Sequence, residues 1–188
     1  MKHLRITLTI LTAILASAVG EAKVTLPSIM SDNMVLQRNT RVNIWGKAAP
    51  GAEITVVPSW DSRTYTAIAD KNGDWITKIT TGGAGGPYSI SVSDGEPVVL
   101  NNILLGEVWI CSGQSNMEMQ VHGFMHQPVA GGLEAILDAP NHPQMRYFTV
   151  GRASLDTPAT NCTGRWSEST PEAVADFSAC AFFFGHLL

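Results

Sequence analysis

The chain has 188 residues, of which 45% are hydrophobic and 15% are charged, and its formal net charge at pH 7 is −4. Such a chain lacks the surplus of Lys and Arg that is typical of proteins binding nucleic acid or anionic membranes, so we expect neither kind of partner. At this length it can form one domain or two small ones.

Residues 1–22 have the pattern of a secretory signal peptide. A short basic start over residues 1–5 precedes an apolar run over residues 6–19, and small residues suited to cleavage occur at positions 16–18. The run is shorter than a membrane span, and no later segment is long and apolar enough to cross a bilayer. We therefore expect an exported mature protein, periplasmic or extracellular, without a membrane anchor after cleavage.

Residues 23–105 are predicted to form an all-β sandwich of jelly-roll or immunoglobulin type. Short runs alternate apolar and polar residues, as strands with one buried face do, and turn signals rich in Gly, Pro and Asn separate them. Closely spaced short strands are typical of such folds. The clearest runs are residues 42–45, 53–57, 64–68 and 88–92.

From residue 106 onward the pattern changes to alternating strands and helices. A β-α-β-α order predicts a parallel sheet with right-handed crossovers, the start of a doubly wound fold. The strands are expected at residues 107–111 and 145–150, and the helices at residues 116–121 and 133–137 and from Asp176 or Ser178 to the end.

Ser115 is the main candidate for chemistry. It follows an apolar run that ends in Ser-Gly-Gln-Ser-Asn, which predicts a tight turn from strand to helix at the carboxyl end of a strand. Gly113 can take the unusual backbone angles or the close approach that this turn demands. Free N–H groups at a helix start favour a developing negative charge, so Ser115 could attack a carbonyl. The alternative is a simple N-cap serine.

The block Gly113-Gln114-Ser115-Asn116-Met117, preceded by Leu105-Gly106-Glu107-Val108-Trp109, resembles the nucleophile block of the sialate O-acetylesterase family. Further similar segments follow the family's order through nearly all of the mature chain. They are residues 26–28, 32–38, 71–75 and 177–185.

The resemblance implies an SGNH-type hydrolase, with a flavodoxin-like parallel sheet, that removes acetyl groups from sugars. Ser115 would be the nucleophile, and Gly113, Gln114 and Asn116 would help to position it or to hold the oxyanion. By position, Ser178 would provide a second oxyanion N–H from the start of a later helix, with a simple N-cap as the alternative. The implied substrate is acetylated sialic acid or another O-acetylated glycan, and no metal or organic cofactor is implied.

The resemblance also implies a catalytic base and its partner from a late Asp-x-x-His motif, and an oxyanion asparagine from a Gly-x-Asn motif. Neither motif follows Ser115. Asp138 and His142 come nearest to Asp-x-x-His, but they are one residue too far apart. His122 and His126 are the local substitutes for the base. With the family's catalytic His and Asp lacking, we expect the isolated chain to be inactive.

Residues 106–188 are expected to be only the N-terminal part of the hydrolase domain. Two strands are too few to make a stable sheet, and residues 181–188 are apolar on nearly every face. The remainder is either missing or supplied by another polypeptide.

Three cysteines in an exported chain leave at least one unpaired. Cys111 is expected to be a small buried residue in a strand, while Cys162 and Cys180 could form a disulfide. No set of Cys and His residues has the spacing of zinc ligands, so we expect no metal site.

Two other functions remain open. The β module could bind glycans through a platform of aromatic rings, with an inert α/β part, although core packing would also account for these rings. They are Trp45, Trp60, Trp75 and Tyr65. The other possibility is an acetyl esterase that acts on plant polysaccharide.

Overall fold

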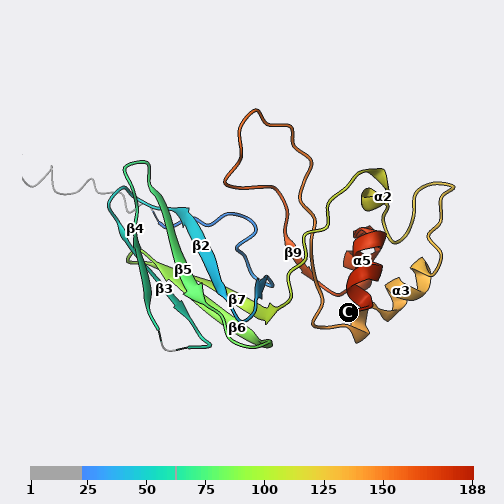
Figure 1. Ribbon diagram of the computed structural model, residues 1–188, viewed down its shortest axis with the longest axis horizontal. Coiled ribbons are helices and arrows are strands. Elements are labelled where there is room, and N and C mark those ends of the chain that lie inside the picture. The colour runs from blue at the N-terminus through green and yellow to red at the C-terminus, as the bar shows by residue number, and fades with distance from the viewer. Residues whose placement is uncertain (1–22, 62) are drawn as a thin grey trace, which may run out of the picture.

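The computed structural model describes residues 23–61 and 63–188, and the expected signal peptide lies outside these residues. Two hydrophobic clusters organise the chain. The larger takes its buried residues from residues 24–103, and the smaller from residues 121–182. Figure 1 shows the strands of the first part on one side and the short helices of the second part on the other.

Seven strands lie within the described residues up to 106. Five of them form a mixed, curled sheet in the order β1-β7-β6-β3-β4, in which β1 and β7 are parallel and the other neighbours are antiparallel. The remaining two, β2 and β5, form an antiparallel pair. The bounds are β1 (Val35–Gln37), β2 (Arg41–Lys47), β3 (Glu53–Pro58), β4 (Tyr65–Ile68), β5 (Asp74–Thr80), β6 (Gly85–Ser93) and β7 (Pro97–Gly106).

The two sheets share one core because their strands alternate buried and exposed residues. In β3, Ile54 and Val56 are fully buried, while Glu53, the first residue of the strand, is exposed. Ile44 of β2 and Ile79 of β5 are also fully buried and belong to the same cluster. This period of two is the pattern that predicted the strands, and each of the four expected runs overlaps one of them.

The second part contains four short helices, one 3-10 turn and one small strand pair. They are α2 (Ser115–Glu118), α3 (Gly132–Asp138), η1 (Ala139–Asn141), β8 (Arg146–Phe148), β9 (Trp166–Glu168), α4 (Pro171–Asp176) and α5 (Ala179–His186). The helix expected at residues 133–137 is confirmed as α3, and Ser178 is the residue that caps α5. None of the described helices is long and apolar enough to cross a bilayer.

The parallel strand pair expected in this part does not form among residues 106–188. β8 pairs antiparallel with β9, and residues 107–111 lie outside any strand. A strand is stable only when a neighbour accepts its hydrogen bonds, and the N–H of Val108 instead donates to the side chain of Gln37 at 2.9 Å. Ile110 is consequently 93% exposed.

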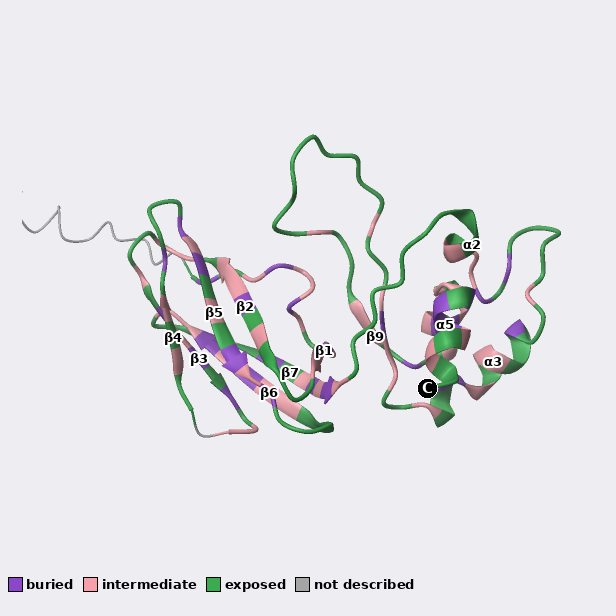
Figure 2. Cartoon of the chain, in the orientation of Figure 1, coloured by how far each residue is buried: buried purple, intermediate pink, exposed green. Residues whose placement is uncertain are grey.

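Helix α5 is the centre of the smaller cluster. Phe182 is 1% exposed, and its ring lies 6.2 Å from that of Tyr147 on β8. On another side of the helix, Phe184 meets Trp109 edge to face at 5.1 Å between ring centroids. Figure 2 shows the buried residues gathered on α5 and along the strands of the first part. The helix therefore connects the segment before α2 with the rest of the second part.

The two parts touch through β9, through the loop before it and through residues 107–108. The indole N–H of Trp166 donates to the Ile29 carbonyl at 2.7 Å, and Asn102 of β7 donates to Glu168 at 2.9 Å. These contacts fix the second part against the sheet.

Candidate active site

Ser115 is the first residue of α2, a single helical turn. We call residues 113–118, which include α2 and the two residues before it, the Ser115 turn. The Gln114 carbonyl accepts hydrogen bonds from the N–H groups of Met117 at 2.9 Å and Glu118 at 3.1 Å, so Gln114 is the N-cap residue. The interpretation of Ser115 as the N-cap is therefore wrong. Ser115 is exposed, and within the described residues its hydroxyl makes no hydrogen bond.

Two backbone donors are free at the same place. The N–H groups of Ser115 and Asn116 have no acceptor among the described residues, as expected for the first positions of a helix. An exposed hydroxyl can attack a carbonyl, and unpaired N–H groups beside it can bind the resulting oxyanion.

Gly113 is required because a side chain at this position would come too close to Met117. A Cβ at this position would lie 3.2 Å from the Cβ of Met117, which is tighter than an ordinary contact. Its φ is not in the left-handed region, unlike that of several other glycines of the chain. Of the two reasons expected for this glycine, close approach is the one seen in the structure.

The N-terminus of α5 lies beside the Ser115 turn (Figure 1). The Ser178 hydroxyl accepts the N–H of Ala181 at 3.3 Å and donates to the sulfur of Met117 at 3.3 Å. Ser178 therefore acts as an N-cap and lies close to the predicted nucleophile block. Its further role as an oxyanion donor stays a prediction.

An ion pair joins the Ser115 turn to the long loop after β8. The guanidinium of Arg152 holds the Glu118 carboxylate through two contacts of 2.7 Å, one from Nε and one from Nη2. Arg152 is 84% exposed, so water and salt weaken the attraction. Such an exposed pair contributes little to stability, and sequence spacing gave no sign of it.

No histidine reaches the Ser115 hydroxyl through a hydrogen bond in the described part of the chain. His122 contacts the Asp176 carboxylate at 3.5 Å instead, and His126 has a φ of 62° in an exposed turn. The Asp138–His142 pair lies at the C-terminal end of α5, whereas the Ser115 turn lies at its N-terminal end. With a rise of about 1.5 Å per residue, the helix separates them by roughly 10 Å.

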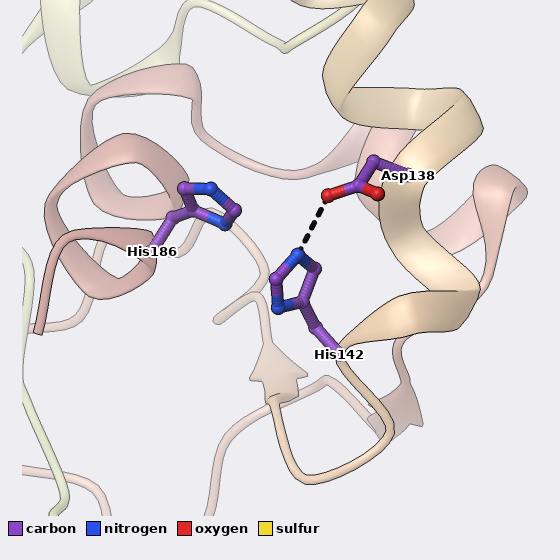
Figure 3. Close-up of side chains that lie close together, drawn as sticks. All are labelled: Asp138, His142 and His186. Carbon is purple, nitrogen blue, oxygen red and sulfur yellow. Dashed lines mark hydrogen bonds and ion pairs between the residues drawn. The ribbon is translucent and has the colours of Figure 1, made fainter.

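Asp138, His142 and His186 come together between α3 and α5 (Figure 3). Their nearest ligand atoms all lie within 4.8 Å of one another. A hydrogen bond of 2.7 Å joins His142 Nε2 to Asp138, and bonds from Asn141 and His142 lower the pKa of the Asp138 carboxyl. Sequence spacing missed this cluster, because His186 joins it only through the fold.

Of the cysteine predictions, the burial of Cys111 was wrong, whereas at least one unpaired cysteine is confirmed. Cys111, Cys162 and Cys180 are all free, and Cys111 is exposed because the strand expected around it does not form. Cys162 lies near Ser28, while the Cys180 thiol donates to the Asn116 carbonyl at 3.3 Å. The possible disulfide between Cys162 and Cys180 is therefore absent.

The four aromatic rings of the β module pack against or within its core. Trp75 is 3% exposed, and the other three are partly buried beside the same cluster. The N–H of Trp60 donates to the Thr80 carbonyl at 2.9 Å, which fixes that ring inward. Trp45 also lines a hollow of about 550 Å³, together with Asp70, Asp74 and Ile76.

Comparisons with known proteins agree with the resemblance in sequence. No family model matches the chain. The sialate O-acetylesterases of Homo sapiens and Mus musculus are 31% and 25% identical to it over 179 residues, which cover 86% of this chain and 33% and 32% of those proteins. The chain thus spans about a third of the length of these relatives.

A solved structure has the same arrangement of the chain. It is a carbohydrate acetylesterase from Xanthomonas citri, 34% identical, with a TM-score of 0.79 over 88% of this chain and 37% of that one. Similarity in sequence and in fold covers nearly the whole described chain. These similarities support a sialate O-acetylesterase-like family for this chain.

Proposed function

We propose that this chain forms part of a carbohydrate O-acetylesterase and supplies its nucleophile, Ser115. The observation that carries the proposal is the exposed Ser115 hydroxyl at the start of α2, beside two N–H groups that have no acceptor in the described part of the chain. The likeness to an acetylesterase in both sequence and fold supports the reaction class. It also supports residues 106–188 as the first part of an SGNH-type α/β domain that follows the β module.

In the proposed reaction, Ser115 Oγ attacks the acetyl carbonyl and gives its proton to a histidine base. The oxyanion accepts hydrogen bonds from backbone N–H groups, including that of Ser115. Collapse of the tetrahedral intermediate expels the sugar oxygen, which takes the proton from the histidine. Water then hydrolyses the acetyl-serine to acetate and restores the serine. The base and its carboxylate would come from residues outside this sequence, in the same or another polypeptide.

The substrate would be acetylated sialic acid or a similarly decorated glycan after export of the protein. Acetylated plant polysaccharide remains the alternative within the same reaction class. Both present an acetyl ester on a sugar hydroxyl, so the chemistry at Ser115 is the same for either.

A chimera tests the nucleophile. Residues 23–188 of this chain replace the matching segment of the Xanthomonas citri acetylesterase, and acetate release from an O-acetylated sugar is measured. We expect activity that Ser115→Ala lowers by at least about a thousandfold, because a triad serine is lost. The matched control, Ser112→Ala, removes a neighbouring exposed hydroxyl and should leave the rate within about twofold.

The isolated chain is expected to show negligible hydrolysis of an aryl acetate, since it lacks the triad base. A folded chimera that stays fully active with Ser115→Ala would refute the assignment of the nucleophile. Turnover by the isolated chain that Ser115→Ala abolishes would instead refute its predicted inactivity.

The hollow beside Trp45 favours a second candidate function, glycan binding by the β module. Its lining combines an aromatic side chain with the carboxylates of Asp70 and Asp74, which suit the faces and hydroxyl groups of a sugar. Calorimetric titration with sialylated and plant-type oligosaccharides should show binding that Trp45→Ala removes. Trp60→Phe, which keeps an inward-facing ring, is the control.

A further inference from the structure

The cluster of Asp138, His142 and His186 has the donor set of a transition-metal site. Two imidazoles and one carboxylate face a single space between α3 and α5, as Figure 3 shows. Their ligand atoms lie within 4.8 Å of one another. Around a tetrahedral ion with bonds near 2.1 Å the ligand atoms are about 3.4 Å apart, so small side-chain rotations would close the site.

Neighbouring residues hold these side chains in the required orientation. Asn141 donates to Oδ1 of Asp138 at 2.7 Å, while Oδ2 faces His142. The His186 ring stacks on Phe182, with centroids 5.6 Å apart and an angle of 20°. Hydrogen bonds and packing of this kind orient ligands in known metal sites.

The surroundings also suit a cation. His186 lies in the last turn of α5, where the helix dipole is negative. Asp138 and His186 line a hollow of about 430 Å³, together with Glu134, so an ion can enter from solvent. The cluster thus combines ligands, orientation, favourable charge and access.

We propose that Asp138, His142 and His186 bind one divalent cation of the zinc class, linking α3 to the end of α5. Imidazole nitrogen together with carboxylate oxygen suits Zn²⁺, Co²⁺ or Ni²⁺ better than Ca²⁺ or Mg²⁺, which prefer oxygen ligands alone. The expectation of no metal rested on spacing along the sequence, and the fold supplies the third ligand. The site is independent of the acyl chemistry proposed for Ser115.

Zinc titration of the 188-residue chain, without an affinity tag and with its cysteines alkylated, tests the site. Calorimetry should show one Zn²⁺ per chain, and His142→Gln and His186→Phe should each weaken binding by more than about tenfold. The second variant keeps an aromatic ring against Phe182. The matched control is His122→Gln, which removes a partly exposed imidazole that also lies beside a carboxylate.

Two further readouts test the site, and the first uses the parent chain alone. In NMR spectra of the parent chain, Zn²⁺ should shift the imidazole signals of His142 and His186 but not those of His122 and His126. Zn²⁺ should also raise the unfolding temperature of the parent and not that of His186→Phe. Absence of saturable binding, or shifts confined to other histidines, would overturn the proposal.

Discussion

At the scale of single residues, Ser115 and Tyr147 show two ways in which the fold sets chemistry. Ser115 is exposed with no partner among the described residues, so the proposed reaction needs a base from elsewhere. Tyr147 is 5% exposed, and its hydroxyl bonds to Ser169 Oγ at 3.2 Å beneath α5. The Ser115 side chain is exposed, whereas the Tyr147 side chain is buried against the helix that lies beside the candidate site.

Tyr147 should make the chain sensitive to alkali. Burial raises the pKa of its phenol, an effect that the Ser169 hydrogen bond and the Arg146 charge partly oppose. The folded state then keeps the proton where the unfolded chain loses it. This contribution to stability is present below about pH 10, the ordinary value, and is lost as pH rises through the raised folded value.

Urea unfolding of the parent and of Tyr147→Phe at several pH values checks this. Near pH 7 the variant should be less stable by about 1 kcal/mol, because it lacks one hydrogen bond. Above pH 10 the parent should lose stability faster, so that the gap narrows. Two curves that stay parallel from pH 7 to 11 would contradict the buried phenol as the cause.

At the scale of elements, local signals were reliable where a residue has a conformational reason to be there. Ser178, one of the two predicted start residues, caps α5 through its side chain. Thr170 caps α4 in the same way and Gly131, with a φ of 73°, precedes α3, although neither was predicted. β7 was not predicted, because Asn101 and Asn102 interrupt its alternation and Asn102 has a φ of 56°. Short-range patterns cannot show such a strand, whose pairing depends on distant neighbours.

The segment over residues 107–111 shows the opposite failure. Its composition is that of a buried strand, yet Trp109 is 57% exposed and no neighbouring strand lies beside it within the described residues. Apolar sequence predicts a tendency to pair, and pairing needs a second strand. The same reasoning explains the candidate site: the Ser115 turn and the Ser178 cap were predictable locally, whereas the His186 cluster required the fold.

At the scale of the whole molecule, the structure depends on how its two hydrophobic clusters are joined. β9 provides one of the links. Trp166 packs against the larger cluster and donates its indole N–H to Ile29, while Glu168 contacts both Asn102 and Arg146. Arg146 is 3% exposed in its side chain, which places this charge contact beside the core of the second part.

Trp166→Ala should uncouple the two clusters. It removes a large ring and the hydrogen bond of 2.7 Å to Ile29, and such a loss costs about 3–5 kcal/mol. Because the contact joins the clusters, we expect the variant to lose cooperativity as well as stability, so that different probes no longer give coincident transitions.

Tryptophan fluorescence, which comes mainly from Trp45, Trp60 and Trp75 of the first part, is compared with helical circular dichroism during urea unfolding. Arg165→Ala, an exposed neighbour, should leave both transitions within about 0.5 kcal/mol of the parent. Coincident transitions in Trp166→Ala would show that the clusters are joined mainly by other contacts.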